Sequence, residues 1–104
     1  MTESISPGQE NHTYQEDFQL SKKIFKQSLD QYQAAKATNF LQKQEAFKKP
    51  MQEALDVLNA SASQLANDQL KVAAEKLRTD YAAFQQNDSK QNTDQLYSDL
   101  KQLG

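Results

Sequence analysis

Glycine and proline are scarce in this chain, which limits what it can fold into. The chain has two glycines and two prolines, and Pro50 is the only one of these four residues that lies between Gly8 and Gly104. β-Hairpins need the tight turns that such residues supply. Valine and isoleucine number four, against eleven leucines, twelve alanines and sixteen glutamines. Because strands favour β-branched residues and helices favour unbranched ones, the composition predicts an all-α domain.

Apolar residues recur every three or four positions in the second half, as on one stripe of an α-helix. The stripe comprises Met51, Leu55, Leu58, Ala62 and Leu65, then Leu70, Ala73 or Ala74, Leu77, Tyr81 and Phe84. Its two parts are out of register by two residues at Asn67–Asp68. Asparagine suits a left-handed C-cap and aspartate an N-cap, so we predict a turn there. A helix from about 69 to 86 should follow.

The first helix is expected from residue 13 or 14 to about Ala37. Thr13 is a favourable N-cap, and Glu16 three residues later completes a capping-box pattern. The apolar stripe of this helix consists of Tyr14, Phe18, Phe25, Leu29, Tyr32 and Ala35. The stripe loses its phase near Thr38–Asn39, where Asn39 and Gln42 form a second capping-box pattern. We therefore predict a boundary or kink at this point.

Pro50 leaves two interpretations of the next segment open. Proline lacks an amide donor and disfavours helical dihedral angles at the preceding residue, Lys49. Pro50 could therefore begin a new helix, or it could kink one helix that runs from Asn39 to Ala66. Because lysine is a poor N-cap, the single kinked helix is favoured.

The end of the chain predicts one more short helix. Residues 87–92 are polar and are expected to form a loop, and Thr93 is expected to cap the helix after it. The apolar residues of that helix are Leu96, Tyr97, Leu100 and Leu103. Four helices with short connections predict an up-down-up-down bundle, a single domain over 13–104. Residues 1–12 contain one aliphatic side chain and are expected to form a flexible, disordered tail.

The residue types that most catalytic and metal sites require are missing or badly placed. The chain has no cysteine, neither glycine lies at a predicted helix start, and the one histidine, His12, lies in the expected tail. This argues against thiolate chemistry, phosphate-cradling loops, and triads or bundle metal sites built on histidine. The carboxylate pairs Glu16–Asp17 and Glu53–Asp56 fall on polar helix faces and are interpreted as solvated surface charge. We therefore predict no catalytic, cofactor-binding or metal-binding residues, and no enzymatic activity.

Charge is unevenly distributed along the chain, whose net charge is −2. The segment from Lys22 to Lys49 contains seven lysines and two acidic residues, whereas both flanking segments are acidic. Nucleic acid or another anionic surface is a distant alternative partner for this basic segment, because Arg78 is the only arginine and the overall balance is acidic. A simpler interpretation is that the lysines solubilise an aromatic-rich helix and pair loosely with acids on the third and fourth helices.

The residues predicted to bind a partner lie in the expected second helix, close to Pro50. They combine three large apolar side chains with a dense pair of lysines, and they are Phe40, Leu41, Phe47, Lys48 and Lys49. A helix irregularity can leave apolar surface uncovered, and lysines would steer an acidic partner toward it. The alternative is that these aromatic residues pack as core against the alanines of the later helices.

We therefore predict a non-enzymatic interaction module that binds another protein, and homo-oligomerisation stays open. In outline the chain resembles small cysteine-free helical proteins: bacteriocin immunity proteins, small secretion chaperones, and the secreted helical-hairpin family with a Trp-x-Gly turn. That family's turn would fall near residues 48–50, which contain neither tryptophan nor glycine, and no tyrosine is followed four residues later by an acid. A partner-specific immunity protein, a secretion chaperone or a secreted helical protein is the alternative function.

The lack of long hydrophobic segments in the sequence indicates where the protein is expected to be located. No apolar run approaches the roughly 20 residues of a membrane span, and the chain shows no hydrophobic signal core. A cytoplasmic location is favoured, with signal-independent export as the alternative.

Overall fold

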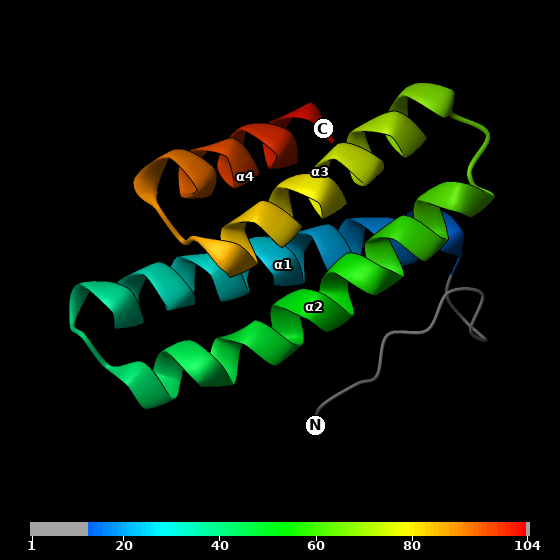
Figure 1. Ribbon diagram of the computed structural model, residues 1–104. Helices are drawn as coiled ribbons and strands as arrows, with labels where there is room; N and C mark the ends of the chain where they lie inside the picture. Colours follow the sequence, from blue (N-terminus) through cyan, green and yellow to red (C-terminus); the bar gives the residue numbers. More distant parts are fainter. Residues whose placement is uncertain (1–12, 104) are drawn as a thin grey trace.

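The computed structural model describes residues 13–103, which form four α-helices joined by short turns (Figure 1). The helices are α1 (Tyr14–Ala37), α2 (Leu41–Gln64), α3 (Asp68–Gln86) and α4 (Lys90–Gln102). Consecutive helices run in opposite directions, and no strand occurs among the described residues. The predicted all-α bundle is confirmed. The predicted tail, residues 1–12, lies outside the described part of the chain.

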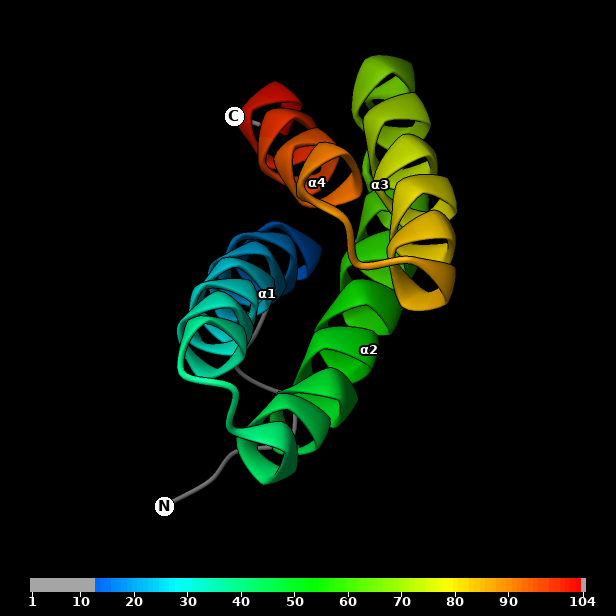
Figure 2. The same cartoon turned by 60° about the vertical axis from the view of Figure 1, so that its left-hand side comes forward.

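Two helical hairpins make up the bundle. α1 packs mainly on α2, and α3 packs on α4; α2 lies against α3, and a smaller contact between α1 and α4 closes the ring. Figure 2 shows α1 and α4 on one side of the bundle and α2 and α3 on the other. Within residues 13–103, no helix has the length and apolar character needed to cross a membrane.

α1 begins as its sequence predicts. The Thr13 hydroxyl accepts the backbone N–H of Glu16 at 3.1 Å, and the Glu16 carboxylate accepts the N–H of Thr13 at 3.0 Å. This reciprocal capping box satisfies two amides that would otherwise lack an acceptor within the helix. Glu16 and Asp17 also place negative charge at the positive end of the helix dipole.

The turn between α1 and α2 lies where the sequence predicts it, but its caps differ. Asn39 has a positive φ of 58°, and the N–H groups of Asn39 and Phe40 bond to the carbonyls of Lys36 and Ala35 at 3.0 and 2.8 Å. This is the Schellman arrangement, with asparagine at the left-handed position that glycine usually holds. The predicted Asn39–Gln42 capping box is therefore wrong, because Asn39 ends α1. Phe40 is the N-cap residue of α2 and has no side-chain cap.

Pro50 lies inside α2, which continues through it. The favoured interpretation of one helix spanning the proline is confirmed, with bounds slightly shorter than the expected 39–66. Pro50 has no N–H to donate to the carbonyl of Ala46, so α2 lacks one of its regular hydrogen bonds. The next residue, Met51, is fully buried. Packing of the apolar face from Met51 onward therefore supports the helix past the proline.

The turn before α3 is confirmed, but its residues have other roles than predicted. α2 ends with Leu65 as C-cap in an extended conformation. Asn67 is the N-cap of α3, because its side-chain oxygen accepts the N–H of Leu70 at 3.0 Å. Asp68 is the first residue of α3, where its negative charge favours the helix dipole.

α4 begins earlier than predicted. Ser89 is its N-cap, since the Ser89 hydroxyl accepts the N–H of Asn92 at 3.2 Å. Residues 87–89 form the predicted loop, but its expected extent to residue 92 is too long, and the predicted Thr93 cap is wrong. Thr93 is buried one turn inside α4, where its hydroxyl donates to the carbonyl of Ser89 at 2.8 Å. A stretch of polar residues became helical because a strong cap preceded it.

The core consists of the predicted apolar stripes, except that Tyr14, at the start of α1, is only partly buried and lies outside it. Its large residues are Phe18, Phe25, Leu29, Tyr32, Met51, Leu55, Leu58, Leu77, Tyr81, Phe84, Leu96, Leu100 and Leu103. Leu65, Leu70 and Tyr97 are half-buried at its margin. Two edge-to-face ring pairs, Phe25 with Tyr81 and Tyr32 with Phe84, have centroids 5.5 and 5.4 Å apart and join α1 to α3. The two hairpins therefore share a single core.

Candidate functional site

The residues predicted to bind a partner lie where α1 meets α2. Phe40 and Leu41 are 47% and 68% exposed, and Lys48 and Lys49 are also exposed. Phe47 is half-buried and packs against the core. The surface termed the α1–α2 corner below comprises Phe40, Leu41, Lys43, Phe47, Lys48 and Lys49.

The α1–α2 corner is exposed because the start of α2 has few neighbours. From Phe40 to Pro50 no residue is buried, whereas burial begins at Met51. Figures 1 and 2 show the first turns of α2 beside the end of α1 and away from α3 and α4. The positions of the other helices, rather than a polar pattern in α2, therefore leave two large apolar side chains in water.

The backbone around Phe40 is held by both helices of the hairpin. Its N–H bonds to the carbonyl of Ala35 in α1, and its carbonyl accepts the N–H of Gln44 in α2 at 3.1 Å. Phe40 thus ends the cap of one helix and starts the next. Because this backbone is already fixed, little main-chain freedom would be lost when a partner covers the Phe40 side chain.

Three lysines lie on the same exposed stretch at the start of α2 as the two apolar residues. Lys43 Nζ lies 5.5 Å from the centroid of the Phe40 ring, within the range of a cation–π contact, and Lys48 pairs with Glu45 at 2.7 Å. Lys49 forms no ion pair with another residue in the range 13–103. The uncapped N–H groups at the start of α2 add partial positive charge. The corner is therefore electropositive.

The turn between α3 and α4 carries a polar contact to α1. Asp88 accepts the Tyr32 hydroxyl at 2.6 Å and pairs with Lys36 at 3.2 Å; Lys36 also donates to the Asp88 carbonyl. The Tyr32 hydrogen bond, followed by Lys36, lowers the pKa of the Asp88 carboxyl. Burial and the nearby Asp88 raise the pKa of the Tyr32 hydroxyl. Lys36 of the basic segment thus pairs with an acid of the α3–α4 turn, whereas the expected partners were acids on the third and fourth helices.

One predicted surface carboxylate is buried. Asp17 is fully buried, so its predicted place on a polar face is wrong, while Glu53 and Asp56 are exposed as expected. The buried positions of α1 include 17, 21 and 25, four residues apart, so the spacing that marks the core also included Asp17. The prediction that Asp17 is exposed was wrong because it relied on the charge of the residue and not on its position in the helical repeat.

Asp99 is a second buried carboxyl group, and burial and its neighbours shift its pKa. It is 2% exposed, and Lys76 Nζ lies 3.0 Å from Asp99 and 2.8 Å from Asp80. Gln95 also donates to Asp99 at 3.0 Å. Burial and the nearby Asp80 raise the pKa of Asp99, whereas hydrogen bonds from Asp99 and Lys76 lower the pKa of Asp80. The contact between Lys76 and Asp99 joins α3 to α4. Asp99 follows Leu96 by three residues, a spacing that could have indicated its burial.

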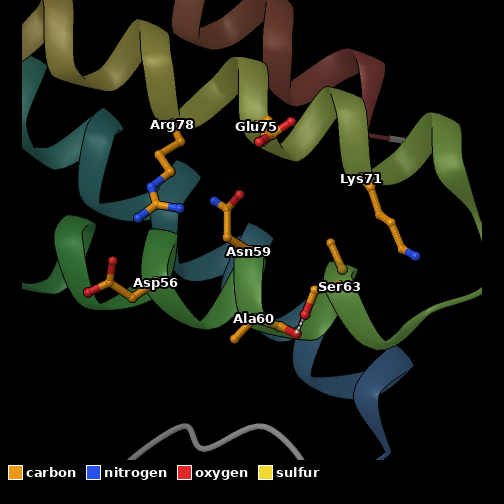
Figure 3. A pocket seen from close by; sticks show the side chains of 8 residues that line it. Asp56, Asn59, Ala60, Ser63, Lys71, Glu75 and Arg78 are labelled. Carbon is orange, nitrogen blue, oxygen red and sulfur yellow. Dashed lines mark hydrogen bonds between the residues drawn. The ribbon is translucent and has the colours of Figure 1, made fainter.

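A groove of about 610 Å³ lies between α2 and α3 (Figure 3). This groove is not predictable from sequence spacing, because its residues come from two separate helices. It is lined by Asp56, Asn59, Ala60, Ala62, Ser63, Lys71, Glu75 and Arg78. No group of three or more His, Cys, Asp or Glu side chains able to hold a metal ion occurs within residues 13–103.

The chain was compared with protein-family models, with curated proteins and with solved structures, and no match was found in any of the three comparisons.

Proposed function

We propose that this protein is a non-enzymatic interaction module that binds another protein through the α1–α2 corner. The observation that supports the proposal is the exposure of Phe40 and Leu41, two large apolar side chains at adjacent positions. Exposed apolar surface with a polar rim marks many protein–protein interaction sites. Lys43, Lys48 and Lys49 supply such a rim, because all three are exposed.

The chemistry of the corner indicates the kind of partner that would bind there. Lysines and uncapped amides favour a partner with acidic side chains, which would also accelerate encounter between the two proteins. Phe40 and Leu41 project from the end of a hairpin, so the partner would supply the apolar pocket that receives them. Aromatic side chains buried in such pockets commonly contribute most of the binding energy.

Affinity capture from the native source tests this proposal. The full chain would be immobilised and compared with Leu41→Ala and with Val72→Ala, a matched control that removes an apolar side chain 65% exposed on α3. We expect a protein that is retained equally by the wild type and Val72→Ala, and about tenfold less by Leu41→Ala. Equal retention by all three proteins would contradict the proposal. A captured toxin or exported protein would support the immunity-protein or secretion-chaperone alternative within the same class.

The captured partner then allows the roles of Phe47 and the lysines to be separated. Phe47→Ala is expected to weaken binding by about 2 kcal/mol or more if Phe47 is an anchor. A loss of stability without a loss of affinity would assign Phe47 to the core instead. Replacing Lys48 and Lys49 by glutamine should mainly slow association and reduce its salt dependence. Lys101→Gln, an exposed charge change on α4, serves as the control.

A further inference from the structure

The groove between α2 and α3 lies apart from the α1–α2 corner, and its α2 wall presents hydrogen-bond acceptors. Asn59 donates one amide N–H to the Leu55 carbonyl at 3.1 Å, and Ser63 donates its hydroxyl to the Ala60 carbonyl at 2.7 Å. These donors are used within the helix. The Asn59 carbonyl oxygen and the lone pairs of the Ser63 hydroxyl are left to accept hydrogen bonds from another molecule.

Asp56 adds a negative charge to the same wall. Its carboxylate accepts the side-chain amide of Gln52 at 3.0 Å, which holds it on the exposed side of α2. Asp56 precedes Asn59 by three residues, so both lie on one face of the helix. The α2 wall therefore combines a carboxylate with neutral acceptors.

The α3 wall supplies the donors. Figure 3 shows Lys71 and Arg78 reaching from α3 toward α2, with Glu75 between them along the helix. Within residues 13–103, Arg78 and Glu75 form no ion pair, and Lys71 has one at 4.0 Å, with the fully exposed Asp68. The planar guanidinium of arginine binds a carboxylate through two parallel hydrogen bonds. The Arg78 guanidinium is thus available to a carboxylate in the groove.

The charges of the lining sum to zero, since Lys71 and Arg78 balance Asp56 and Glu75. An anion alone would meet two carboxylates, and a cation alone would meet two basic groups. We infer that the groove binds a small zwitterionic ligand that carries a carboxylate and an ammonium group, as a free amino acid or a short peptide does. Arg78 donates to its carboxylate, and Asp56 and Asn59 accept from its ammonium. The volume of about 610 Å³ is in the usual range for small-ligand sites.

Amide chemical shifts of the full chain test this inference. Alanine and tetra-alanine are the zwitterionic probes, while N-acetylalanine lacks the ammonium charge and alaninamide lacks the carboxylate. We expect a zwitterion to shift the amides of residues 56–63 and 71–78, and each singly charged analogue to bind at least about tenfold more weakly. Tighter binding of alanine would identify a free amino acid, and tighter binding of tetra-alanine a peptide. No shifts with either zwitterion, or equal binding of the analogues, would overturn the inference.

Variants of Arg78 provide the second test. Arg78→Gln removes the guanidinium and should weaken zwitterion binding about tenfold or more. Arg78→Lys keeps the charge but lacks the planar fork, so its affinity should lie between those of the wild type and Arg78→Gln. Lys101→Gln makes the same charge change outside the groove and should bind as the wild type does. Arg78 is exposed, and the amide spectrum of each variant verifies its fold. Unchanged affinity in both Arg78 variants would overturn the inference.

Discussion

The two turns at the same end of the bundle use their side chains in opposite ways. Between α1 and α2, polar Asn39 supplies a left-handed backbone conformation, and apolar Phe40 is left in water. Between α3 and α4, Asp88 reaches α1, where it bonds to Tyr32 at 2.6 Å and to Lys36 at 3.2 Å. The α3–α4 turn connects the two hairpins, and the α1–α2 turn faces outward.

This difference shows that the polarity of a turn residue does not decide whether it contacts the rest of the bundle or stays exposed to solvent. Asp88 is charged, yet α1 supplies two partners for it, so its contacts stabilise the bundle. Phe40 is apolar, yet α3 and α4 lie away from the start of α2, and Phe40 stays half-exposed. The neighbouring hairpin decides both outcomes, and it leaves Phe40 available for binding.

The largest effect on the free energy of unfolding is expected for residues of the core that the two hairpins share. Leu58 in α2 and Leu77 in α3 are fully buried, so Leu58→Ala and Leu77→Ala should each lower the free energy of unfolding by about 2–5 kcal/mol. Urea denaturation measures this quantity. Gln64→Ala and Gln85→Ala, at exposed positions, should change it by no more than about 0.5 kcal/mol. If either leucine variant matched its glutamine control, the hairpins would not share a core and the contrast between the turns would fail.

A smaller effect is expected from the connecting turn. Asp88→Ala removes the acceptor of Tyr32 and Lys36 and should lower the free energy of unfolding by about 1 kcal/mol, because the carboxylate is partly exposed. Asp94→Ala is the matched control, since it breaks an exposed pair with Lys90 inside α4. That control should cost less than about 0.5 kcal/mol. Equal losses in the two variants would mean that Asp88 does not connect the hairpins.

The pH dependence of stability should separate Asp88 from Asp99. The pKa of Asp88 lies below its ordinary value of 3.8, so folding favours the ionised form, and this stabilisation is lost as the pH falls below 3.8. The pKa of Asp99 lies above 3.8, so folding favours the protonated form, and stability rises as the pH falls toward 3.8.

Urea denaturation at a series of acidic pH values would reveal the two contributions. Asp88→Asn should reduce the loss of stability that occurs as the pH falls below 3.8. Asp99→Asn should abolish the gain of stability that occurs as the pH falls toward 3.8. Profiles parallel to that of the wild type in both variants would contradict the assigned directions.

The smallest effect on stability is expected at the outward-facing turn. Leu41→Ala should change the free energy of unfolding by no more than about 0.5 kcal/mol, because Leu41 is 68% exposed, and Phe40→Ala, at a half-exposed position, should change it by no more than about 1 kcal/mol. The measurement is again urea denaturation. A loss well above 1 kcal/mol in either variant would show that the residue is part of the core and would remove the basis of the proposed binding surface.

Helix positions could be predicted because they depend on neighbours within a few residues. The Thr13 capping box and the register change near Asn67 are local signals, and both mark real helix boundaries. Where two caps competed, the prediction failed. Ser89 and Thr93 are both favourable N-caps, and Ser89 was used, which placed Thr93 in the core. Spacing alone does not decide between two adequate caps.

The candidate sites were predictable to different extents. Phe40 and Leu41 were identified from their place near Pro50, while their exposure follows from where α3 and α4 lie. The groove could not be predicted, because Asp56 and Arg78 belong to different helices and line the same groove only in the folded chain. Asp99 was missed because an acidic residue is normally solvated, and Lys76 compensates it only in the folded chain.

The sequence by itself determined the all-helical fold, the apolar stripes and the approximate position of each turn, since these follow from side-chain type and the helical repeat. Tertiary structure decided which members of each face are covered. The helical repeat assigns a residue to a face, but burial also requires another helix at the same height along the bundle. That requirement is met at Met51 and Asp99 and not at Phe40 and Leu41. The surface available for binding is therefore a property of how the two hairpins dock.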